Sequence, residues 1–147
     1  MSNGQSIPFE TTYLVRDTCL CLHTQRAARA FARRFDEALR PAGLTNGQFS
    51  LLMSLNRPQP ASMGSVASLL AMDRTTLTAA LKPLERRGLV DVRPDPKDKR
   101  SRLITRTPEG LSLLSRAVPI WEATHKAVEA LASGDADRLR THLLALS

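Results

Sequence analysis

The chain has 147 residues, a length that fits one domain of ordinary size and is too short for two independent hydrophobic cores. Hydrophobic residues make up 42% and charged residues 24%, which excludes global disorder, while an aromatic content of 4% favours a helical core of leucine, alanine and valine. The net charge of +7 predicts a polyanionic partner, either nucleic acid or an acidic membrane surface.

The first element is predicted to be one long amphipathic helix. Residues 12–39 contain neither Gly nor Pro, and apolar residues recur among arginines until Pro41. Cys19 and Cys21 stand two residues apart on this helix, where side chains point in different directions. We therefore expect two thiols rather than a disulfide.

Three further helices are expected in the central region. Thr45 and Gln48 have the spacing of a capping box and open the first of them. A short apolar-periodic helix follows over residues 63–71. Asp73 then offers an N-cap for a helix over residues 74–87. The last two, joined by a tight turn, predict a helix-turn-helix.

The C-terminal half begins with a predicted hairpin. Residues 89–93 and 102–106 are β-branched and roughly alternating, and they flank a charged turn. A helix opened by Thr107 and Pro108 follows, and its apolar residues from Leu111 to Ala132 alternate at spacings of three and four. Such a seam is typical of helices that pack lengthwise against one another. A last short amphipathic helix is expected over residues 135–146.

The helix over residues 74–87 carries the most informative surface. Three leucines share one face, whereas the opposite face combines small hydroxyls with cations. Short side chains let a helix approach base edges in the major groove, and Lys or Arg can reach phosphates or guanine. The alternative is a well-capped charged surface helix. On this helix and the hairpin we predict contacts to DNA from Arg74, Thr75, Thr76, Thr78, Lys82, Lys97, Asp98, Lys99, Arg100 and Arg102.

The hairpin that follows this helix strengthens the DNA hypothesis. Residues 73–106 hold ten basic and five acidic side chains, so +5 of the charge falls in this stretch. A basic hairpin directly after a helix-turn-helix is the winged arrangement. Asp98 and Arg100 are two residues apart, so on an extended strand they could pair and hold the guanidinium for a minor groove. The alternative is a solvated turn kept basic for solubility.

The apolar seam also predicts assembly. The helices at both ends of the chain carry more apolar surface than one small winged lobe can cover, so a second copy is expected to cover it. The alternative is that these helices cover the lobe of a monomer. The residues predicted to form the dimer contact are Leu114, Val118, Trp121, Leu139 and Leu143.

Taken together, the chain resembles the MarR family of winged-helix transcriptional regulators. The resemblance rests on five stretches in the family's order: residues 43–48, 73–78, 84–90, 95–101 and 103–110. It implies a mainly α fold with a small β-hairpin wing, in one domain over residues 1–147. A winged helix-turn-helix lobe would occupy about residues 45–106, and dimerisation helices about residues 10–40 and 108–147.

The resemblance also implies partners. A homodimer would place two lobes on a pseudo-palindromic operator in double-stranded DNA, and a small-molecule or oxidant site would lie between the dimer helices and the lobe. In the hydroperoxide-sensing branch of the family a reactive cysteine lies at the distance from the second helix that Cys21 has here. The two tyrosines that accompany it there are replaced by Phe35 and Asn46. The alternative is that Cys19 and Cys21 fill a helix interface.

The sequence therefore predicts a cytoplasmic, sequence-specific regulator, a repressor released by a ligand or oxidant. Its rival is a winged-helix protein-interaction module without specific DNA readout. No phosphate-binding loop, nucleophile elbow or zincin motif is present, so no enzyme activity, catalytic residue or cofactor is expected. Cys19 and His23 could share a metal, but one such pair is common by chance, and no metal site is predicted. The first eight residues lack the pattern of a secretory leader, and no membrane span is expected.

Overall fold

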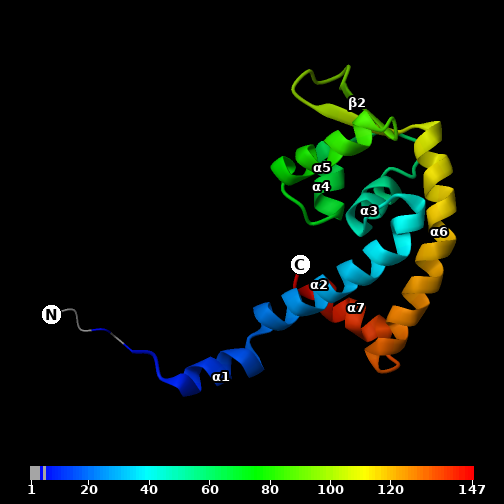
Figure 1. Cartoon of the computed structure of the whole chain (residues 1–147). Helices are drawn as coiled ribbons and strands as arrows, with labels where there is room; N and C mark the ends of the chain where they lie inside the picture. Colours follow the sequence, from blue (N-terminus) through cyan, green and yellow to red (C-terminus); the bar gives the residue numbers. More distant parts are fainter. Residues whose placement is uncertain (1–3, 5) are drawn as a thin grey trace. The chain divides into compact units, whose positions relative to one another are not determined.

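The structure is a computed structural model that describes residue 4 and residues 6–147, so part of the N-terminal segment considered for a leader lies outside it. By its internal contacts the chain divides into two units, residues 1–34 and residues 35–147. The elements are α1 (Phe9–Thr18), α2 (Leu20–Leu39), η1 (Arg40–Ala42), α3 (Asn46–Ser54), β1 (Ala61–Ser62), α4 (Met63–Leu69), α5 (Arg74–Arg86), β2 (Val90–Pro94), β3 (Arg102–Arg106), α6 (Pro108–Glu129), η2 (Ala130–Ala132) and α7 (Ala136–Ala145) (Figure 1).

The mainly α fold with a small hairpin is confirmed, but the single helix predicted over residues 12–39 is wrong. Cys19 has an extended backbone with ψ 109°, and it separates α1 from α2. Its Sγ accepts the N–H of Leu22 at 3.4 Å, which is the bond that an N-cap side chain makes three residues before its donor. The Thr18 hydroxyl donates to the Leu14 carbonyl at 2.6 Å. Cysteine is not a usual capping residue, so no local sequence signal predicts this break.

The predicted caps of the winged lobe are confirmed. Thr45 and Gln48 form a complete capping box at the start of α3. The side chain of Asp73 accepts the Thr76 N–H at the start of α5, and the Thr107 side chain accepts the Gly110 N–H at the start of α6. Each cap satisfies a backbone N–H that the first turn of a helix leaves without a partner. Local sequence therefore decides where these helices begin.

The hairpin belongs to a sheet with one strand more than predicted. β2 pairs antiparallel with β3, with Val92 opposite Ile104, and the strand order is β1-β3-β2. β1 has two residues, and Ala61 lies opposite Ile104 on the other edge of β3. Two residues are too few to show a periodic pattern, so sequence analysis missed β1. The sheet fixes the base of the hairpin to the start of α4.

The core of the second unit lies between the helices of the lobe and the sheet. Its most deeply buried side chains come mainly from α3, α5 and the hairpin, and residues of α6 join them. α6 passes along α3 and continues beyond it (Figure 1). The largest fully buried side chains are Leu39, Leu51, Leu52, Leu77, Leu84, Ile104, Val66 and Val90.

Of the glycines in this unit, Gly110 leaves the least room for a side chain. It lies in the first turn of α6, where a Cβ atom would stand 2.3 Å from the backbone oxygen of Leu89. That carbonyl also accepts the N–H of Thr107 at 3.1 Å, and the Thr107 hydroxyl donates to the Gly88 carbonyl at 2.7 Å. Together these contacts join the start of α6 directly to the chain entering β2.

Candidate nucleic-acid interface

Helix α5 is held in place by its buried face and its N-cap. Leu77, Leu81 and Leu84 are all buried in the core. Asp73 caps the helix through Oδ1, which accepts the Thr76 N–H at 2.7 Å, and through Oδ2, which accepts the Thr76 hydroxyl at 2.8 Å. These bonds to Thr76 hold the pKa of Asp73 below its usual value, so the cap stays ionised. The orientation of the opposite face is thereby fixed.

The predicted contact residues of α5 are all exposed, but the three threonine hydroxyls differ in whether they are free to bond to DNA. Arg74, Thr75, Thr76, Thr78 and Lys82 face solvent. The Thr76 hydroxyl is used by the cap. The Thr78 hydroxyl donates to the Arg74 carbonyl at 2.8 Å and keeps its lone pairs, so it can still accept a bond. The Thr75 hydroxyl forms no hydrogen bond with another residue in the described part of the chain, so it can both donate and accept.

The tip of the hairpin is a compact turn rather than an extended strand. Asp95 Oδ1 accepts the Lys97 N–H at 2.9 Å, and Asp98 Oδ1 accepts the Arg100 N–H at 3.0 Å. The Ser101 N–H donates to the Asp98 carbonyl at 2.9 Å, which closes the turn. Side chains of aspartate commonly stabilise turns by accepting a backbone N–H two residues on.

The predicted pairing of Asp98 with the Arg100 guanidinium is therefore wrong. Within residues 6–147 no ion pair joins these two side chains within 4.0 Å. The pairing required an extended strand, whereas the backbone here turns and brings the Arg100 N–H to the carboxylate instead. Lys97, Lys99 and Arg100 are exposed at the tip.

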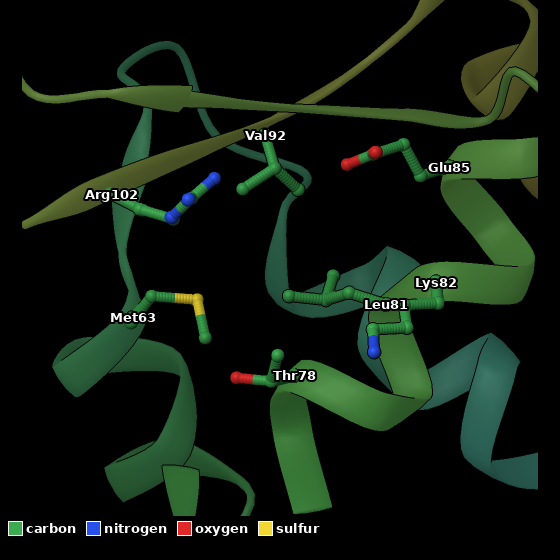
Figure 2. Close-up of a pocket in the computed structure, with 7 residues that line it drawn as sticks. All are labelled: Met63, Thr78, Leu81, Lys82, Glu85, Val92 and Arg102. Carbon is green, nitrogen blue, oxygen red and sulfur yellow. The ribbon is translucent and has the colours of Figure 1, made fainter. Parts of the chain in front are cut away.

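A pocket of about 270 Å³ lies between α5 and the hairpin. Thr78 and Lys82 line it from α5, and Arg102 lines it from β3. Figure 2 shows the Arg102 guanidinium and the Glu85 carboxylate pointing into this space from opposite sides. Arg102 thus lies at the base of the wing, beside the exposed face of α5. The pocket therefore brings one residue predicted for the wing together with two residues predicted for the helix.

Most cations of this surface lack an intramolecular partner. In residues 73–106 the one ion pair found among described side chains joins Arg93 to Asp91 at 3.8 Å. Arg87 is used structurally, because its Nη1 donates to the Gly43 carbonyl at 2.9 Å. The remaining cations leave a positive field over α5 and the wing. Such a field is what binding to a phosphate backbone requires.

The predicted dimer residues separate into three groups. Leu114 is 2% exposed and belongs to the core of its own chain, so its assignment to the dimer contact is wrong. At this point the apolar face of α6 is directed toward the lobe, where it packs on α3. Val118 and Trp121 are half-buried against the same core. Leu139 and Leu143 on α7 are 39% and 43% exposed, and no residue of α7 is buried in the chain.

The two cysteines are free thiols with different surroundings. Cys21 is exposed on α2, and the Gln25 side-chain amide donates to its Sγ at 3.1 Å. Cys19 is half-buried and acts as the cap of α2 described above. The geometry gives Cys21 access to solvent and one donor to its sulfur.

Two features of the second unit were missed at the sequence level. The Asp36 carboxylate accepts the Asn46 backbone N–H at 2.7 Å and its side-chain amide at 2.8 Å, which joins the end of α2 to α3 and lowers the pKa of Asp36. The Trp121 ring stacks on His125 at 4.6 Å and on Phe49 at 6.0 Å. The Trp121–His125 contact joins neighbouring turns of α6, whereas the Asp36–Asn46 bonds and the Phe49–Trp121 stack join different helices, which no local pattern relates.

A second pocket, of about 210 Å³, contains both positions that replace the tyrosines of the hydroperoxide-sensing branch. It lies where the end of α2 meets α3 and α6. It brings together Phe35, Leu39, Asn46, Phe49, Ser50, Trp121 and His125.

The described residues, 4 and 6–147, contain neither a candidate membrane span nor a candidate metal site. No helix there is long and apolar enough to cross a membrane. No group of three or more His, Cys, Asp or Glu side chains there could hold a metal ion.

The model of the MarR family matches residues 44–101. The transcriptional activatory protein BadR of Rhodopseudomonas palustris is 42% identical over 76 residues, which cover 50% of this chain and 43% of BadR. The chain spans about half the length of the curated relatives that it matches first.

Solved structures match over most of the chain. The Mycobacterium tuberculosis regulator MosR, in complex with DNA, is 39% identical with a TM-score of 0.81, covering 88% of this chain and 93% of that one. CouR of Rhodococcus jostii, bound to p-coumaroyl-CoA, is 25% identical with a TM-score of 0.73, covering 90% and 93%. With the capped helix-turn-helix, the three-stranded wing and these matches, the chain belongs to the MarR family.

Proposed function

We propose that this protein is a sequence-specific DNA-binding transcriptional regulator. The observation that carries the proposal is the juxtaposition of the exposed face of α5 with the base of the wing, where Thr78, Lys82 and Arg102 line one pocket. Threonine and lysine on a fixed helix suit base edges and phosphates of a major groove, and exposed cations at a hairpin tip suit the adjoining phosphates. Related proteins of this fold are described in complex with DNA.

The proposed regulator acts as a homodimer on a pseudo-palindromic operator. Two lobes bound to successive major grooves must be held about 34–36 Å apart. A single lobe can contact only one of the two half-sites. The exposed apolar residues of α7 support a second copy as the partner. The contacts proposed for each lobe are Arg74, Thr75, Thr76, Thr78, Lys82, Lys97, Asp98, Lys99, Arg100 and Arg102, with Asp98 acting through the turn and not on DNA.

The test is binding to DNA from upstream of the gene, measured by fluorescence anisotropy against a random duplex at several salt concentrations. Specific binding predicts tighter binding to one footprinted site and a steep loss of affinity with salt, about 0.9 log units per released phosphate contact for each tenfold rise in salt. Equal affinity for every duplex would favour the rival protein-interaction module.

A matched pair of charge reversals locates the surface. Lys82→Glu should abolish specific binding, whereas Lys126→Glu, an exposed cation on α6 with the same change of net charge, should preserve it. Thr78→Leu removes a hydroxyl near the proposed base edges and should cost about 1–3 kcal/mol of binding free energy. Equal effects of the two reversals would show that only net charge matters.

The proposed signal is a small molecule or an oxidant. The pocket that holds Phe35 and Asn46 has the place that the family resemblance gives to an effector site, and CouR binds a coenzyme A ester. Oxidation of the exposed Cys21 thiol to a sulfenate is the second candidate signal. Titrating the operator complex with an organic hydroperoxide distinguishes the two signals. If the hydroperoxide releases DNA from wild type and Cys19→Ser but not from Cys21→Ser, the signal is an oxidant. If all three proteins stay bound to DNA, the result favours a small-molecule ligand.

A further inference from the structure

One acidic side chain of the surface proposed to meet DNA differs from the others. Residues 73–106 contain five acidic side chains. Four of them accept a hydrogen bond from the backbone or pair with a cation: Asp73, Asp91, Asp95 and Asp98. The fifth is Glu85, whose carboxylate forms neither a side-chain hydrogen bond nor an ion pair within 4.0 Å with another residue in the described part of the chain.

The free protein gains little from a carboxylate at this position. Glu85 lies in the last turn of α5, where the helix dipole disfavours a negative charge. Its side chain is exposed, so it contributes nothing to the core. On the surface proposed to meet DNA, an unpaired carboxylate also repels phosphates. An interaction that forms only in the complex with DNA would offset both effects.

Arg102 is the cation that faces this carboxylate. It lies two residues from Ile104 on β3, so its side chain leaves the strand on the same face as that core residue, toward the lobe. Glu85 and Arg102 both line the pocket of about 270 Å³ between α5 and the hairpin. In Figure 2 their charged groups point toward one another across this pocket, whereas the Lys82 ammonium points away from Glu85. Among the described side chains, Arg102 has no ion-pair partner within 4.0 Å.

A phosphate gives these two groups a reason to meet. Glu85 and Arg102 are both exposed, and rotation about their side-chain bonds can bring them together across the pocket. Without DNA such an exposed ion pair contributes little to stability, because water screens the charges and the side chains lose rotational freedom. A guanidinium has more N–H donors than a bidentate carboxylate uses, so the others remain for a phosphate.

We propose that Glu85 is a positioning residue for DNA binding: its carboxylate binds the Arg102 guanidinium and holds it against a phosphate of the bound duplex. The inference rests on the proposed function only in that the protein binds DNA. It predicts an effect of unusual sign, because removing a negative charge ordinarily strengthens binding to a polyanion. If Glu85 acts through Arg102, its removal weakens binding instead.

The first test compares two substitutions that make the same change in net charge. Glu85→Ala should weaken binding to the footprinted operator about threefold and lower the salt slope by as much as about 0.9, because Arg102 is no longer held against one phosphate. Glu37→Ala removes an exposed acid of α2 outside the pocket and should leave binding unchanged or slightly tighter. Fluorescence anisotropy at several salt concentrations measures both. Tighter operator binding by Glu85→Ala would overturn the proposal.

A double-mutant cycle identifies the partner of Glu85. Arg102→Ala alone should weaken operator binding about fivefold, since it removes the phosphate contact itself. Adding Glu85→Ala to that variant should cause no further loss, and binding should recover slightly because the substitution then removes only a repulsion. An equal loss from Glu85→Ala in the wild-type and Arg102→Ala backgrounds would show that the two side chains act independently, which would overturn the proposal.

Two further variants test the choice of partner and the need for charge. Lys82 is the other cation of the pocket, and in the Lys82→Ala background Glu85→Ala should weaken binding by the same factor as in wild type. Glu85→Gln keeps the size of the side chain but not its charge, so it should lose most of the affinity that Glu85→Ala loses. Coupling of Glu85 to Lys82 alone, or wild-type binding by Glu85→Gln, would overturn the assignment.

Stability and random DNA separate the remaining explanations. Because Glu85 lies at the negative end of the helix dipole, Glu85→Ala should not lower the Tm measured by circular dichroism. A lower Tm, with an equal loss of binding in both backgrounds of the cycle, would overturn the proposal by showing a purely structural role. If the chain binds the operator and a random duplex equally, the proposed specific function fails, while the cycle measured on the random duplex still decides the role of Glu85. Absence of binding to any duplex would contradict both.

Discussion

At the scale of single residues, Gly110 shows how one absent side chain fixes the orientation of α6. Gly110→Ala should destabilise the fold by roughly 1–3 kcal/mol, because the new Cβ would meet the Leu89 carbonyl and force the start of α6 away from β2. Urea unfolding followed by circular dichroism measures the change.

The control for this prediction is another helical glycine. At Gly47 in α3 an added Cβ would meet its nearest atom, the Thr45 hydroxyl oxygen, at 4.0 Å. Gly47→Ala should therefore be neutral or stabilising by up to about 1 kcal/mol, from helix propensity alone. Equal destabilisation by both substitutions would contradict the steric explanation.

Asp36 gives a residue-level prediction that depends on pH. Its pKa is lowered first by the backbone N–H and then by the side-chain amide of Asn46, so its contribution to stability is present above the unfolded pKa of about 3.9 and is lost as pH falls through the lower folded value. Asp36→Ala should destabilise the protein by about 1 kcal/mol at pH 7, and the difference from wild type should shrink below about pH 4.

Glu37→Ala is the control for that series. Glu37 is the exposed neighbour of Asp36 on α2 and forms no side-chain hydrogen bond with another described residue. Its substitution should leave the unfolding free energy nearly unchanged at both pH values. A difference between Asp36→Ala and wild type that is constant from pH 7 to pH 3 would contradict the role of the carboxylate.

At the scale of elements, the wing is shaped by its two aspartates. Because Asp98 accepts the Arg100 N–H, Asp98→Ala should loosen the tip and weaken operator binding modestly, whereas Asp98→Asn keeps an oxygen acceptor and should restore binding. Anisotropy titrations of the operator measure both. If Asp98→Asn does not restore binding, the charge of Asp98 is needed, and that result would support the predicted ion pair with Arg100.

Arg100 at the same tip should act through its charge. Arg100→Ala should weaken operator binding and lower the salt slope by about 0.9, the value of one phosphate contact. An unchanged slope in this variant would show that the guanidinium lies away from the phosphates.

At the scale of the whole molecule, the exposed apolar residues of α7 are proposed to form the dimer contact. Leu139 and Leu143 lie four residues apart on one helical face and are half-exposed. Leu143→Arg should lower dimer stability and operator affinity together, because two lobes must keep their spacing. Sedimentation velocity and anisotropy measure the two effects.

Leu144→Arg is the matched control for assembly. Leu144 is 76% exposed and lies off the Leu139–Leu143 face, so its substitution should preserve both the dimer and operator binding. The sequence pattern predicted Leu114 as a dimer residue, but Leu114→Arg should unfold the lobe because Leu114 is in the core. A monomeric Leu143→Arg variant with full operator affinity would contradict the proposed dimer.

The sequence by itself determined the elements that depend on local signals. Capping residues lie within three positions of the N–H groups that they satisfy, so Thr45, Asp73 and Thr107 could be identified without tertiary information. The leucine face of α5 and the alternation of the hairpin are likewise local. With the motifs around them, these features were enough to indicate the family and the surface proposed to meet DNA.

The tertiary structure decided what depends on contacts between distant residues. Cys19 breaks the first helix through a sulfur acceptor, β1 exists because β3 offers it an edge, and Asp98 meets a backbone N–H because the tip turns. Leu114 and Leu143 share an apolar pattern in sequence, yet one faces the core and the other faces solvent, since the packing of α6 on α3 ends before α7 begins. Periodicity identifies an apolar face, but only the positions of the other elements determine whether the same chain or a partner covers it.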